Sequence, residues 1–168
     1  RIEPGIAAGR PESTIRGVGL VIWLVICFGA AAVGTRFPPG SWYEGLVRPA
    51  WTPPNSAFGP VWTVLYVCMA IAAWLVWQQS GFRGAVVPLT LFLVQLALNT
   101  AWSWLFFGLH EVGWALVDIV LLSIGITVTM RMFYARHRLA GLLLAPYLAW
   151  VLLATVLNWQ IWRLNPTA

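Results

Sequence analysis

Long apolar segments alternate with short polar ones along most of the chain of 168 residues. A helix that crosses about 30 Å of hydrocarbon needs about 20 apolar residues, each adding about 1.5 Å. Five segments meet this length, at residues 17–35, 58–79, 84–107, 112–134 and 139–162. The pattern predicts an all-α membrane protein, a five-transmembrane-helix bundle in which residues 17–165 form a single domain. Residues 1–16 are polar and contain glycine and proline, which predicts a disordered or trimmed lead-in.

One connection differs from the others. The later segments are joined by the short linkers 80–83, 108–111 and 135–138, which force neighbouring helices to run antiparallel. The connection 36–57 is long, and its prolines exclude a continuous helix. It is also low in charge and rich in large apolar side chains, namely Trp42, Tyr43, Leu46, Val47 and Trp51. A long loop of this kind is typically functional. We expect it to cover one end of the bundle as a lid.

Composition excludes a soluble globular domain, because 60% of residues are hydrophobic and 9% are charged, against roughly 25% charged in soluble domains. The net charge of +5 comes from arginines near the ends of apolar segments, where they orient helices. We therefore predict no nucleic-acid binding. Arginines are more frequent on the side of the N-terminus than on the side of the lid. This bias favours an inside N-terminus, with the lid and the end of the last helix opposite.

Few residues could support conventional catalysis. Cys27 and Cys68 lie inside apolar segments without a Cys/His cluster, so we predict neither a disulfide nor a metal site. His110 and His137 lie at segment ends, which argues against haem ligation in mid-membrane. The sequence contains no Ser/His/Asp set and no glycine-rich phosphate loop. Any reaction would have to proceed without acid–base machinery.

Polar side chains inside the apolar segments gather on shared helical faces. Because polar groups are costly in lipid, such faces usually point into the bundle. The third, fourth and fifth segments carry these faces, with Gln95, Asn99, Trp102 and Ser103, then Asp118, then Tyr147, Trp150, Ala154 and Asn158. For Asn99 and Asn158, interhelical hydrogen bonds and a polar cavity are equally good interpretations. For Asp118 a hydrogen bond between helices, made while protonated, is slightly favoured.

The chain holds 12 tryptophans, and most have an ordinary explanation. An interfacial belt explains those near segment ends, which are Trp74, Trp77, Trp102, Trp104, Trp114, Trp159 and Trp162. Trp150 lies in mid-segment, and Trp62 lies one turn inside the second segment. Together with Trp42 and Trp51 of the lid, these two favour an aromatic cavity for a large, flat, apolar ligand.

Short motifs occur in a fixed order over residues 34–165. They are Trp42-Tyr43, Arg48-Pro49-Ala50-Trp51-Thr52-Pro53-Pro54, Gly59-Pro60-Val61-Trp62, Leu65-Tyr66, Gln95-Leu96-Ala97-Leu98-Asn99, Phe106-Phe107-Gly108, Gly113-Trp114-Ala115-Leu116-Val117-Asp118, Pro146-Tyr147-Leu148-Ala149-Trp150, Leu157-Asn158-Trp159 and Trp162-Arg163. In this order and spacing the chain resembles the TspO/translocator protein family, also called tryptophan-rich sensory proteins or peripheral benzodiazepine receptors.

The resemblance implies a five-helix protein, commonly a homodimer, in a bacterial membrane or the mitochondrial outer membrane. It implies a receptor or sensor that binds porphyrins such as protoporphyrin IX, and also sterols and benzodiazepine-type ligands, with no obligatory cofactor. The implied pocket lies in one half of the bundle, closed by the loop after the first helix. The ligand-binding residues expected from the matching positions and the polar stripe are Tyr43, Pro53, Trp62, Tyr66, Asn99, Trp102, Asp118, Tyr147, Trp150 and Ala154.

Two other functions stay open. The first is a transporter of tetrapyrroles or sterols. The second is light-dependent porphyrin degradation, for which the resemblance implicates Trp62 and Trp150 as the catalytic residues.

Two further features bear on sterols and on assembly. The sterol-recognition stretch of the family matches in part, as Leu157, Trp159 and Arg163, with tryptophan in place of tyrosine. Small residues four apart, the pairs Ala30/Gly34 and Ala97/Ala101, allow close helix approach. They suit either a homodimer interface or packing inside one chain.

Overall fold

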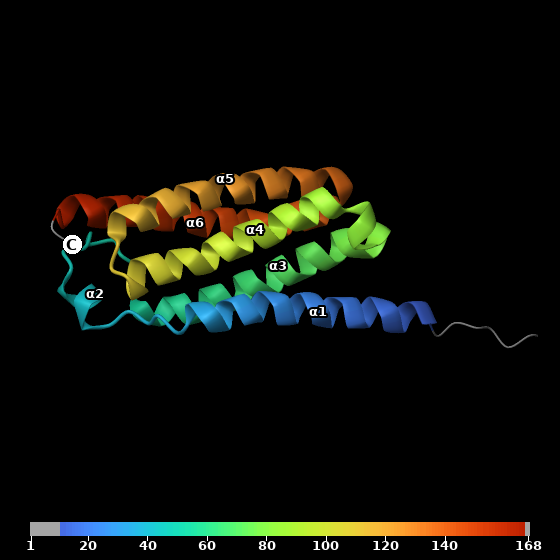
Figure 1. The fold of residues 1–168 in the computed structure, drawn as a ribbon, viewed down its shortest axis with the longest axis horizontal. Coiled ribbons are helices and arrows are strands. Elements are labelled where there is room, and N and C mark those ends of the chain that lie inside the picture. The colour runs from blue at the N-terminus through green and yellow to red at the C-terminus, as the bar shows by residue number, and fades with distance from the viewer. Residues whose placement is uncertain (1–10, 167–168) are drawn as a thin grey trace, which may run out of the picture.

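The computed structural model describes residues 11–166, with side chains from residue 17 onward, and shows a helical bundle (Figure 1). Its elements are α1 (Pro11–Gly34), α2 (Ser41–Gly45), α3 (Asn55–Gly84), α4 (Val86–Ser103), η1 (Trp104–Gly108), α5 (Val112–Arg136) and α6 (Arg138–Leu164). Within the described residues, 5 stretches are long and apolar enough to span a membrane: Gly17–Gly34, Asn55–Gly84, Val86–Gly108, Val112–Arg136 and Arg138–Leu164. They confirm the five predicted segments, and the chain is a multi-pass integral membrane protein.

Two helix boundaries that differ from the predicted ones lie at Pro11 and near Gly81. Helix α1 starts at Pro11, because a proline is well tolerated in the first turn, where its missing N–H would have no partner. Residues 1–10 of the predicted lead-in lie outside the described residues. Helix α3 runs through the predicted linker 80–83 and turns at Gly81, which has a φ of 64° and a ψ of −174°. Glycine alone adopts this conformation at low cost.

Small side chains let the helices approach closely. On α3, Ala70, Ala72 and Ala73 are completely buried in the core. A methyl group added at Gly34 would lie 3.5 Å from the Ser103 hydroxyl, an ordinary van der Waals distance, so α1 lies close to α4 at this point. Ala97 is exposed on the outer side of α4. The homodimer stays a prediction.

The two ends of the bundle carry different connections (Figure 1). One end holds the start of α1, the turn from α3 to α4 and the turn from α5 to α6. The other holds α2, the turn from α4 to α5 and the end of α6. This is the up-and-down arrangement that the short linkers predict.

Residues 35–54, which include α2, form a lid over the second end. The ring of Tyr43 is 3% exposed and packs edge-on against Phe106 and Phe107, at centroid distances of 6.1 and 5.4 Å. Two reciprocal hydrogen bonds of 3.0 Å attach the lid to the end of α6, from the Val47 N–H to Asn165 Oδ1 and from Asn165 Nδ2 to the Val47 carbonyl. The lid is thus anchored by a buried aromatic ring and by a polar clasp.

Candidate ligand-binding cavity

A cavity of about 600 Å³ lies at the lid end of the bundle, between α1, α3, α4, η1 and α6. Its lining residues are Phe28, Ala31, Ala32, Gly34, Thr35, Phe37, Pro38, Pro39, Tyr43, Asn55, Phe58, Gly59, Trp62, Thr63, Tyr66, Asn99, Trp102, Ser103, Phe106, Phe107, Ala154, Leu157, Asn158 and Ile161. The alanines and glycines among them leave space, and the aromatic side chains surround it.

Two aromatic pairs form parts of the wall. Trp62 and Tyr66, one turn apart on α3, hold their rings 5.5 Å apart at an interplanar angle of 31°. Trp102 stacks on Phe106 at 5.1 Å and 26°. Trp102 near the end of α4 and Phe106 in η1, the π-helical turn that continues α4, are four residues apart and both line the cavity. A cavity with such walls offers flat apolar surfaces on more than one side.

Hydrogen bonds between helices fix these rings. The Tyr66 hydroxyl donates to Asn99 Oδ1 at 2.8 Å, which links α3 to α4. The Trp102 indole N–H donates to Asn158 Oδ1 at 2.9 Å, and Asn158 Nδ2 donates to the Val112 carbonyl at 3.0 Å. Both interpretations of the two asparagines therefore hold, since each lines the cavity and bonds between helices. In lipid such bonds contribute about 0.6–2 kcal/mol each.

Six of the ten expected ligand-binding residues line the cavity, namely Tyr43, Trp62, Tyr66, Asn99, Trp102 and Ala154. Tyr147 and Trp150 lie behind the wall instead. Tyr147 is fully buried, donates to Gln95 Oε1 at 2.9 Å and meets Trp62 edge-on at 6.1 Å. Trp150 packs edge-on against Phe58 at 5.7 Å. Each supports a ring that reaches the cavity.

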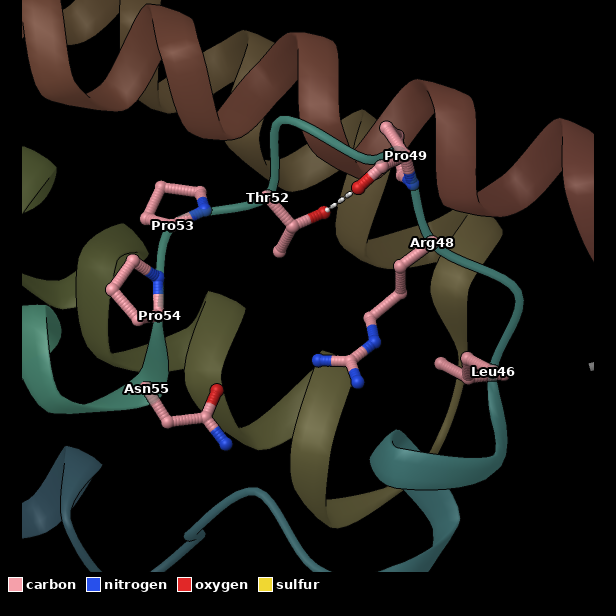
Figure 2. A pocket seen from close by; sticks show the side chains of 7 residues that line it. All are labelled: Leu46, Arg48, Pro49, Thr52, Pro53, Pro54 and Asn55. Carbon is pink, nitrogen blue, oxygen red and sulfur yellow. Dashed lines mark hydrogen bonds between the residues drawn. The ribbon is translucent and has the colours of Figure 1, made fainter.

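The other two expected residues have different surroundings. Asp118 is buried on α5, which contributes no side chain to the cavity, and its Oδ2 has no hydrogen-bond partner among the described residues. The interhelical bond expected for this carboxyl is therefore not formed at that oxygen. Pro53 lines a second pocket of about 540 Å³ in the lid, shown in Figure 2.

Two groupings expected from the sequence are not brought together. Trp42 stacks on His110 at 4.1 Å, and Trp51 is 43% exposed, so neither lid tryptophan lines the cavity. The short helix α2 turns Tyr43 inward in their place. In the sterol stretch, Leu157 lines the cavity, whereas Trp159 is 42% exposed with the Arg163 guanidinium 5.2 Å above its ring. Residues two apart on a helix cannot share a face.

Sequence reasoning missed the contribution of α1 and of the phenylalanines. Phe28, Phe58, Phe106 and Phe107 supply much of the wall, yet apolar residues in a membrane helix face lipid and cavity alike. No pattern in the sequence separates the two. Among the described residues, no group of three His, Cys, Asp or Glu side chains could hold a metal ion. The cavity is suited to bind a flat apolar molecule through its rings.

Known proteins resemble this chain over most of its length. The model of the TspO/MBR family matches residues 19–163. The human translocator protein is 47% identical over 138 residues, which cover 79% of this chain and 82% of that protein. Protein CrtK of Rhodobacter capsulatus is 40% identical over 149 residues, covering 86% and 91%. A tryptophan-rich sensory protein of Cereibacter sphaeroides is 37% identical over 143 residues, covering 85% and 89%.

Proposed function

Because the chain belongs to the TspO/MBR family, we propose that it is a membrane receptor or sensor that binds a porphyrin of the protoporphyrin IX type beneath its lid. The observation that carries this proposal is the aromatic cavity of about 600 Å³, which falls within the range of about 300–1,000 Å³ for small-molecule pockets. A porphyrin is flat, large and mostly apolar, so it suits walls made of indole and phenyl rings. Sterols and benzodiazepine-type ligands, being apolar, would use the same walls.

Trp62 offers the most direct test, because its ring lines the cavity. We expect Trp62→Ala to weaken protoporphyrin IX binding about 5- to 150-fold, since stacking on an aromatic side chain contributes about 1–3 kcal/mol. Absorbance titration of the porphyrin into protein in lipid nanodiscs measures the dissociation constant. Trp150→Ala should have a smaller effect, because Trp150 does not line the cavity and only contacts Phe58, which does.

Trp114→Ala is the matched control. Trp114 lies on α5, is 66% exposed and lines no part of the cavity. This variant should bind porphyrin like the unmodified protein. Equal affinity of the Trp62→Ala variant, with the fold intact by circular dichroism, would refute binding in this cavity.

Transport is a weaker proposal than binding. Transporters commonly carry helices that are broken at the membrane midplane around the substrate. Among the described residues, the departures from regular α-helix lie near helix ends, at Gly81 and at Trp104–Gly108. The degradation alternative needs both implicated tryptophans at the ligand, and only Trp62 lines the cavity.

A further inference from the structure

The second pocket, of about 540 Å³, lies between the lid and the start of α3. Figure 2 shows the seven side chains that line it, Leu46, Arg48, Pro49, Thr52, Pro53, Pro54 and Asn55. Arg48 is the charged residue among them, and no acidic residue lines the pocket with it. The Thr52 hydroxyl donates to the Pro49 carbonyl at 2.7 Å, which stiffens the loop around the arginine.

The guanidinium of Arg48 reaches into the middle of this pocket, with the Asn55 amide on the facing side (Figure 2). It lies 4.6 Å from the centroid of the Tyr43 ring, and the residue is half-buried. The stacking positions the cation, but an aromatic ring does not neutralise its charge. A guanidinium presents a planar set of N–H donors that matches the two oxygens of a carboxylate. The pocket therefore provides a cation and an amide where an anionic group would be neutralised.

This pocket adjoins the aromatic cavity. Asn55 lines both, and Tyr43, which carries the Arg48 guanidinium on its ring, also lines the cavity. Among the residues that line the cavity itself, none is charged. One molecule could thus place its rings in the cavity and an acidic substituent in the lid pocket. A ligand of purely apolar surface would leave the lid pocket unused.

We propose that the lid pocket is an anion subsite, in which Arg48 pairs with a carboxylate of the ligand whose rings occupy the aromatic cavity. The inference rests on the proposed function and extends it, because an aromatic acid would gain a contact with Arg48 that a neutral apolar molecule in the same cavity lacks. Asn55 supplies a further hydrogen-bond donor to the same carboxylate. The cation–π contact with Tyr43 couples the occupied subsite to the closed position of the lid.

The test compares protoporphyrin IX, which bears two carboxylates, with its uncharged dimethyl ester. Both are titrated into the full chain in nanodiscs of neutral phosphatidylcholine. The unmodified protein should bind the diacid more tightly than the ester. Arg48→Gln should weaken diacid binding about 10- to 150-fold, as expected for loss of a charge-assisted hydrogen bond worth about 1.5–3 kcal/mol, and leave ester binding within about twofold.

Arg36→Gln is the matched control, because it removes an exposed arginine from the same lid outside both pockets. It should keep the preference for the diacid, and Arg48→Lys should retain part of it. If Arg48→Gln weakens diacid and ester equally, Arg48 only supports Tyr43 and the subsite is refuted, while cavity binding stands. If Arg48→Gln leaves diacid binding unchanged, the subsite is also refuted. If the unmodified protein binds neither porphyrin, both the proposed function and this inference are wrong.

Discussion

The clasp between Val47 and Asn165 makes a prediction about lid opening. Replacing Asn165 by alanine removes both the acceptor for the Val47 N–H and the donor to the Val47 carbonyl. Tyr43 stays packed on Phe106 and Phe107, so the lid loses its polar attachment and keeps its aromatic one. The variant should therefore open more often without unfolding the bundle.

The size of the effect follows from the exposure of the two bonds. A hydrogen bond inside a protein contributes about 0.5–1.5 kcal/mol net, and exposed ones lie toward the lower end. Since both bonds of the clasp are exposed, we expect a total of about 1–2 kcal/mol. The ratio of open to closed lid should rise by about 5- to 30-fold.

Hydrogen exchange measured by mass spectrometry on peptides covering residues 42–48 reports this ratio, because a backbone N–H exchanges when the lid opens. Exchange in Asn165→Ala should speed up by that factor, and protoporphyrin IX should dissociate faster. Gln79→Ala is the control, since it removes an exposed bond of 3.4 Å, from Gln79 Nε2 to the Arg136 carbonyl, at the opposite end of the bundle. Unchanged lid exchange in Asn165→Ala would show that Tyr43 alone holds the lid.

Two further predictions concern stability. Gly81→Ala should lower the free energy of unfolding by about 1–3 kcal/mol, because a φ of 64° with a ψ of −174° excludes a side chain. Chemical unfolding in detergent measures this free energy. An unchanged unfolding midpoint would contradict the prediction. Porphyrin affinity should not change. Tyr66→Phe removes the hydroxyl that donates to Asn99 at 2.8 Å and keeps the ring at the cavity wall. The variant should lose about 0.6–2 kcal/mol of unfolding free energy. A loss of porphyrin-binding free energy as large as this loss of stability would argue against a purely structural hydroxyl.

The membrane helices were predictable because hydrocarbon thickness sets a length that apolar segments must meet. Their ends were less so. Hydropathy does not show that α3 continues through Ser80 to Gly84, since a polar residue at the membrane surface is compatible with helix and loop alike. The hydropathy pattern also did not predict α2 within the lid, because a helix of 5 residues is too short to show a periodicity.

The cavity was predicted in part for a related reason. Asn99 and Trp102 share a polar face that lipid disfavours, so their inward position follows from the sequence. Trp150 and Phe58 are both apolar aromatic residues, and only the rotation of α6 against α3 decides which of them reaches the cavity. That rotation depends on packing between helices, which one segment read alone does not contain.

The clasp also has a consequence for the order in which the protein is made. Val47 and Asn165 are 118 residues apart, so the lid leaves the ribosome long before the residue that fastens it. The wall of the cavity is also completed late, because it combines Ala154, Leu157 and Asn158 of α6 with residues that are synthesised much earlier. Until then the helices already in the membrane enclose a cavity that lacks the side chains of α6. The wall of the candidate cavity can be completed only after α6 has been synthesised.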